Sequence, residues 1–170
     1  MIKRSLKNTK YEPSNTITID SDSDFINYGF PGSGTTEDPY LIQRLNITAS
    51  SGDLIAIHNT QVFFIIRTNY LYGLTGSQGW ILFDYVQNGR VENKIVKNVM
   101  VVGICIYFSS YNTIINNSDS HCGISGIHAE LSSLNNIIIA NTVFNNAGNG
   151  IQVGKYALRH VKFTTTWQSG

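Results

Sequence analysis

The chain has 170 residues, of which 42% are hydrophobic and only 14% are charged, and its net charge is +1. This length predicts one domain with a buried core, and the near-neutral charge offers no basic surface of the kind that nucleic acid requires. No run of about 18 apolar residues occurs, so the sequence predicts no membrane-spanning helix. The 18 asparagines and 22 isoleucines favour many short strands separated by turns, because isoleucine suits a pleated surface and asparagine tolerates the backbone of turns.

The N-terminal segment MIKRSLKNTKYEPSN begins with basic residues but lacks the apolar core of a signal peptide, so we expect residues 1–15 to form a tail. Either the protein is intracellular, or this chain lacks its leader.

Repeated lines occupy the rest of the chain, and glycines open five of them, at Gly52, Gly79, Gly103, Gly126 and Gly150. The steps between these glycines are 27, 24, 23 and 24 residues. Each line holds short apolar bursts such as ICIY and NIII, closed by glycine or asparagine. The leucines do not fit a leucine-rich repeat, and no line carries an amphipathic stripe of helix length. The stride therefore indicates a solenoid of parallel strands in which each line forms one coil.

Asparagines recur at the same stride and are expected to stack from coil to coil in two files. Stacked amides can bond to one another and to the backbone of the turns. The first file contains Asn69, Asn93, Asn117 and Asn141, and the second contains Asn88, Asn112 and Asn136.

Alternation along the first strand of each line predicts which side chains enter the core. The inward columns are Trp80, Ile104, Ile127 and Ile151, and then Leu82, Ile106, Ala129 and Val153. The outward columns are Ile81, Cys105, His128 and Gln152, and then Phe83, Tyr107 and Glu130.

The C-terminal line, KYALRHVKFTTTWQSG, loses the asparagine marker, because Thr165 stands in its place. Three explanations stay open. The last coil caps itself, the chain is a fragment of a longer solenoid, or a second copy covers this end by end-to-end association.

The segment GFPGSGTTEDPYLI, from Gly29 to Ile42, and the later G-I-x-I…N-x-I-x-x-N lines resemble right-handed parallel β-helix proteins. That broad group includes carbohydrate-binding proteins, sugar hydrolases, NosD-type periplasmic proteins and archaeal surface proteins. The resemblance covers about Ile17 to Val153. It implies an all-β, right-handed parallel β-helix of about five coils of 23–27 residues. It also implies a cap over residues 16–51, followed by coils over residues 52–170, the last of them irregular from residue 150.

The outward face of the first strands is the predicted binding site. Phe83 and Tyr107 are expected to stack on a sugar ring, and the hydroxyl groups of that sugar are expected to bond to His128, Glu130 and Gln152. The alternative is an aromatic column that only stabilises the sheet. No adjacent coils place acids in one column of the first strand, which disfavours a glycosidase pair or a lyase calcium site, so no catalytic residue is assigned.

A weaker hypothesis concerns metal, because Cys105, Cys122, His121 and His128 are soft or borderline ligands, although they form no CxxC motif and no paired histidine spacing. No cofactor is expected. The sequence thus favours a non-catalytic module that binds carbohydrate or serves as a structural surface protein, and the resemblance places it outside the cytoplasm or at the cell surface. The alternatives are a fragment of a polysaccharide-acting enzyme and a NosD-like, copper-associated protein.

Overall fold

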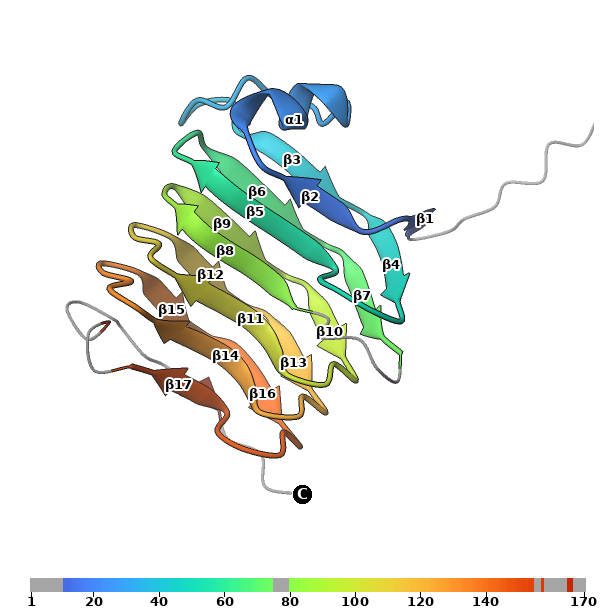
Figure 1. The fold of residues 1–170 in the computed structure, drawn as a ribbon, viewed down its shortest axis with the longest axis vertical. Coiled ribbons are helices and arrows are strands. Elements are labelled where there is room, and N and C mark those ends of the chain that lie inside the picture. Colours follow the sequence, from blue (N-terminus) through green and yellow to red (C-terminus); the bar gives the residue numbers. More distant parts are fainter. Residues whose placement is uncertain (1–10, 75–79, 155–156, 158–164, 167–170) are drawn as a thin grey trace, which may run out of the picture.

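The chain winds into a parallel β-solenoid of about five coils, and the computed structural model describes residues 11–74, 80–154, 157 and 165–166 (Figure 1). Three sheets run along the solenoid, and each full coil contributes one strand to each of them. Sheet A contains β1 (Glu12–Ser14), β4 (Leu45–Ala49), β7 (Tyr70–Gly73), β10 (Ile95–Lys97), β13 (Ser118–Ser120), β16 (Asn141–Phe144) and β18 (Thr165–Thr166). Sheet B contains β2 (Ile17–Ile19), β5 (Ile55–Thr60), β8 (Ile81–Val86), β11 (Val102–Tyr107), β14 (Ser125–Glu130) and β17 (Ile151–Val153). Sheet C contains β3 (Tyr40–Gln43), β6 (Phe64–Arg67), β9 (Gly89–Glu92), β12 (Thr113–Ile115) and β15 (Ile137–Ile139).

Neighbouring strands pair in parallel from one coil to the next, which confirms the predicted all-β solenoid. The coils begin earlier than predicted, because β1 and β4 pair with each other and β2 pairs with β5. The segment expected to be only a cap therefore contains the first coil. The predictions for the irregular last coil and for its end-to-end contact fall mainly on residues 155–156, 158–164 and 167–170, which lie outside the described residues.

Helix α1 (Asp22–Asn27) covers the N-terminal end of the solenoid (Figure 1). Ser21 and Asp24 form a capping box at its start. The Phe25 ring is fully buried and stacks on the Tyr40 ring, with their centroids 4.8 Å apart. Its centroid lies 5.3 Å from that of the Phe64 ring. The helix thus covers apolar rings that the first coil would otherwise expose to water. Within the described residues no helix is long and apolar enough to cross a membrane.

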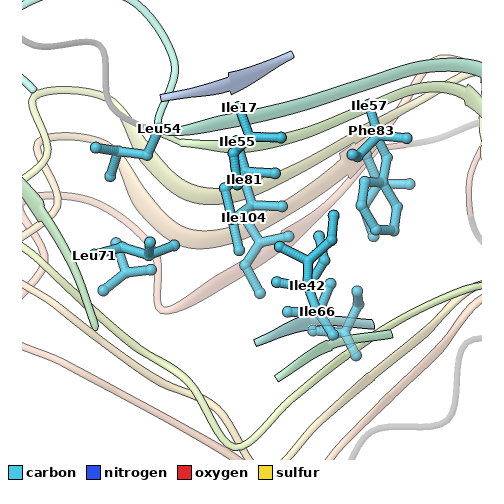
Figure 2. Packing of buried hydrophobic residues seen from close by; sticks show 14 of the residues in the cluster. Ile17, Ile42, Leu54, Ile55, Ile57, Ile66, Leu71, Ile81, Phe83 and Ile104 are labelled. Atoms are coloured by element: carbon cyan, nitrogen blue, oxygen red, sulfur yellow. The ribbon is translucent and has the colours of Figure 1, made fainter. Parts of the chain in front are cut away.

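Aliphatic side chains stack in files inside the coils. Figure 2 shows Ile17, Ile55, Ile81 and Ile104 one behind the next, with Ile57 and Phe83 in a neighbouring file. Each labelled residue is at most 2% exposed. Burying an isoleucine fully contributes about 1.5–3 kcal/mol, so these files supply much of the stabilisation of the fold.

The coil that begins with β8 is displaced by one residue from its predicted register. Ile81 pairs with Ile104 and Phe83 pairs with Ile106, so Ile81 and Phe83 are the inward residues. The assignment of Trp80 and Leu82 to the inward columns was wrong. A shift of one residue exchanges the two faces of a strand, and here the apolar Ile81 and Phe83 side chains gain burial from it.

The same displacement changes both asparagine files. Five asparagines are buried in them, namely Asn69, Asn117 and Asn141 in one file and Asn112 and Asn136 in the other. The prediction was wrong for Asn93 and Asn88, whose places are taken by Lys94 and Gly89. Lys94 donates its N–H to Asn117 Oδ1, and Gly89 donates to Asn112 Oδ1. Asn93 and Asn88 instead occupy turn positions with φ of 49° and 61°, a conformation that asparagine tolerates.

An ion pair is buried inside the solenoid. Asp119 lies on the inward side of sheet A, where the paired positions of the neighbouring coils are Val96 and Val143. Lys94 Nζ lies 2.7 Å from Asp119 Oδ1, and both side chains are fully buried. Burial is the main cause that lowers the pKa of Lys94 and raises the pKa of Asp119, while the charge of each partner opposes the shift. The two departures from the repeat pattern therefore compensate each other.

Candidate functional site

The outward side of sheet B, called the B face below, carries the residues predicted to bind ligand. With the corrected register its first column contains Ala56, Leu82, Cys105, His128 and Gln152. Its second column contains His58, Asp84, Tyr107 and Glu130. The structure therefore keeps Tyr107, His128, Glu130 and Gln152 together on one face.

Phe83 does not belong to the B face, and its predicted contact with a ligand was wrong. Its side chain is 0% exposed and meets Phe64 edge-on at 5.3 Å inside the coil. Asp84 takes the outward position beside Tyr107 instead. The reason is that strand β8 buries its apolar positions and exposes its acid, which a stride counted from glycine to glycine does not reveal.

Tyr107 stands between Asp84 and Glu130 in the second column and is half-buried. Its ring meets His128 and Trp80 edge-on, with centroids 6.2 and 6.4 Å apart. Burial is the main cause that raises the pKa of Tyr107, and its interaction with Cys105 acts in the same direction. The hydroxyl group therefore stays neutral in the physiological range and can both donate and accept a hydrogen bond.

Two histidine–carboxylate pairs flank Tyr107. His128 Nε2 lies 3.0 Å from Glu130 Oε1, and His58 Nδ1 lies 3.7 Å from Asp84 Oδ2. Both carboxylates are 35% exposed, so they remain accessible to a ligand. Sequence analysis missed His58 and Asp84. The alternation Ile81, Phe83 inward and Leu82, Asp84 outward was the signal that could have found them.

Gln152 ends the first column and is already hydrogen-bonded within the protein. Its Oε1 accepts bonds from Ser125 Oγ and Asn149 Nδ2, each at 3.4 Å. The side-chain amide nitrogen can still donate to a ligand.

The four candidate metal ligands do not converge. Cys105 and His128 are neighbours in the first column, whereas His121 and Cys122 follow β13 and line a groove of about 710 Å³ between sheets A and B. Both thiols are buried, and burial raises the pKa of each to about 12, which disfavours the thiolate that binds metal. Within the part of the chain that the structure describes, no group of three or more His, Cys, Asp or Glu side chains is arranged to hold a metal ion.

A family model described as a right-handed β-helix region matches residues 11–165. The chain belongs to the right-handed β-helix family. The match extends over almost the whole β-helix and establishes the handedness that the resemblance implied. Comparisons with curated proteins and with solved structures gave no match. The family description names a fold and no ligand, so what this β-helix binds has to be argued from its own side chains.

Proposed function

We propose that this β-helix is a non-catalytic module that binds a carbohydrate on its B face, outside the cytoplasm or at the cell surface. The observation that carries the proposal is the second column, in which the Tyr107 ring lies between Asp84 and Glu130, with His58 and His128 beside the two acids. The apolar side of a sugar packs against an aromatic ring, while its hydroxyl groups need donors and acceptors nearby. The B face offers both kinds of contact.

The repeat of the coils suits an extended ligand. Neighbouring strands lie about 4.8 Å apart, so a chain lying along the solenoid meets one set of side chains in each coil. Side chains on regular strands are held in place by packing on both sides, which limits the ordering cost of binding. The cellular location rests on the resemblance to exported β-helix proteins, and fractionation of the native cells tests it.

A glycan array tests the binding function with wild type and three variants. Wild type is expected to bind, and Tyr107→Ala and Glu130→Gln are expected to bind about 5- to 30-fold more weakly, since each removes a contact worth about 1–2 kcal/mol. Phe108→Leu is the matched control, because Phe108 is an exposed ring next to Tyr107, and the next coil already has Leu131 at that position. Absence of binding by wild type, or an equal loss in the control, contradicts the proposal.

Hydrolysis of a polysaccharide is a second candidate, and the corrected register favours it. Asp84 and Glu130 now share one column and lie two coils apart, so their Cα atoms are separated by about 10 Å. Inverting glycosidases hold their two carboxyl groups about 6.5–9.5 Å apart, a separation that two side chains on Cα atoms about 10 Å apart can reach. If the module is an enzyme, wild type releases reducing ends from a polysaccharide, and Asp84→Asn and Glu130→Gln each abolish the release. Binding without any release by wild type leaves the non-catalytic function.

A further inference from the structure

A separate hollow lies where sheet B turns into sheet C. Its volume is about 240 Å³. Three successive coils line most of it, with Phe63 from the first, Asn88 and Arg90 from the second, and Tyr111 and Thr113 from the third, and the segment before β3 adds Thr36 and Pro39. None of these residues belongs to the B face. We call this hollow the corner slot.

The walls of the corner slot are two aromatic side chains with a short one between them. Phe64 pairs with Gly89, and Arg90 pairs with Thr113, so Phe63, Asn88 and Tyr111 occupy one position in three successive coils. The Cα atoms of Phe63 and Tyr111 are therefore separated by two strand spacings, about 10 Å. Aromatic rings pack with centroids about 4.5–7 Å apart, so the space above Asn88 accommodates one further ring.

Tyr111 presents an exposed ring from a turn position. It is 60% exposed, and its φ is 61°. Asn88 and Asn135, at the same position in the adjacent coils, have φ of 61° and 56°, which asparagine adopts readily and tyrosine does not. Among the described residues no other ring contacts that of Tyr111. Tyr85 and Phe108 also have positive φ, of 56° and 45°, but their rings stack on each other. Tyr111 differs because its exposed, unstacked ring lies beside a cavity.

The polar groups of the corner slot suit a neutral ring with hydroxyl groups. Asn88 Nδ2 donates to the carbonyl of Gln61 at 2.8 Å, which leaves its Oδ1 as an acceptor. Arg90 Nε donates to Glu92 Oε2 at 2.6 Å, so Glu92 balances its charge while the terminal nitrogens can still donate. Thr113 adds a hydroxyl group that does both.

We infer that the corner slot binds a single neutral sugar ring between Phe63 and Tyr111, with Asn88, Arg90 and Thr113 bonding its hydroxyl groups. This second site lies apart from the B face, and only its class of ligand rests on the proposed function. It holds one ring, at the end of a glycan or in a side branch, whereas the B face holds an extended stretch.

Titration of the protein with neutral monosaccharides, followed by two-dimensional NMR, tests this site. Tyr111→Asn is the decisive variant, because it installs the residue that the adjacent coils carry and should fold at least as stably as wild type. We expect it to bind at least about tenfold more weakly than wild type. Tyr85→Asn is the matched control, since Tyr85 is 57% exposed with φ of 56°, and Asn59 occupies its position in the preceding coil. This control should bind like wild type.

Three results would overturn the inference. In the first, no monosaccharide shifts the NMR peaks of wild type, or Tyr111→Asn binds the monosaccharide as tightly as wild type does. In the second, Tyr111→Asn weakens the binding of adenosine but not the binding of any sugar, which assigns the slot to flat heterocycles. In the third, Glu130→Gln abolishes monosaccharide binding and Tyr111→Asn does not, which places the sugar on the B face and leaves the proposed function intact. Loss confined to Tyr111→Asn supports the corner slot whatever the result for the B face.

Discussion

The buried pair of Lys94 and Asp119 should be costly to break and nearly neutral to replace. In Lys94→Asn, the Asp119 carboxyl group stays fully buried without its partner Lys94, and in Asp119→Val the Lys94 ammonium group stays buried without Asp119. Removing one member of a buried pair costs about 3–5 kcal/mol. The double variant restores both repeat patterns, with an asparagine in the file of Asn69 and Asn117 and a valine at the paired position between Val96 and Val143.

Urea denaturation followed by circular dichroism measures these free energies of unfolding. We expect each single variant to lose about 3–5 kcal/mol, which lowers Tm by about 10 °C for a domain of this size. The double variant should be within about 1 kcal/mol of wild type, or more stable than it. The reasoning fails if both single variants cost less than about 1 kcal/mol, or if their effects add in the double variant.

The pH dependence of the stability of Lys94→Asn gives an independent check that Lys94 is the partner of the buried Asp119. The charge and hydrogen bond of Lys94 are the causes that lower the pKa of Asp119, so without Lys94 only burial remains, and it raises the pKa above the ordinary value of 3.8. The folded state of the variant then keeps a proton that the unfolded state releases, so stability is highest below about pH 4 and falls as the pH rises toward the raised pKa. The double variant lacks this carboxyl group and should not show the fall.

Three further predictions follow from the register of the coils. Asn117→Ala should lower the free energy of unfolding in urea by about 2–4 kcal/mol, because the N–H of Lys94 and the carbonyl of Val91 lose their hydrogen-bond partner. The control Asn93→Gly should change it by less than about 0.5 kcal/mol, because Asn93 occupies a turn position with positive φ. Equal effects of the two variants would contradict the corrected asparagine files. Both cysteines are buried with pKa values near 12, so neither should react with a thiol reagent at pH 8 until the protein unfolds, and fast labelling of the native protein would refute this burial. Gly123→Ala places a Cβ atom against the Met100 carbonyl oxygen and should cost about 1–3 kcal/mol by thermal denaturation. Ala147→Gly, at the same position one coil later, should cost less than about 1 kcal/mol.

Most of the predicted binding residues share one face for a reason that is visible in the sequence. Tyr107, Glu130, His128 and Gln152 follow strands whose alternation is regular, and a residue two places along a strand lies on the same face. The prediction for Phe83 failed because Trp80, Ile81, Leu82 and Phe83 are all apolar, so alternation alone does not fix the register of this strand. Burial decided between them, and burial depends on the coils on either side.

The corner slot could not have been found in the same way. Phe63 and Tyr111 are far apart in the chain, and only the pairing of β6, β9 and β12 brings them to one position with Asn88 between. Their separation of 48 residues is two strides of 24, but that stride would place Gln87 between them, whereas the observed register places Asn88 there. The cavity exists because a short side chain happens to lie between two long ones in a column, which is a property of three coils together.

The sequence by itself determined the solenoid, because a stride of about two dozen residues with β-branched bursts and turn asparagines allows no other way to bury the apolar side chains. Only the tertiary structure decided the register of the coil from β8 to β10, and with it the exchange of Asn93 for Lys94 and of Phe83 for Asp84. The physical reason is that a turn can absorb one residue at little cost, whereas the strand that follows then turns every side chain to its other face. Packing against the neighbouring coils, and the partner that Asp119 needs, select one of the two outcomes.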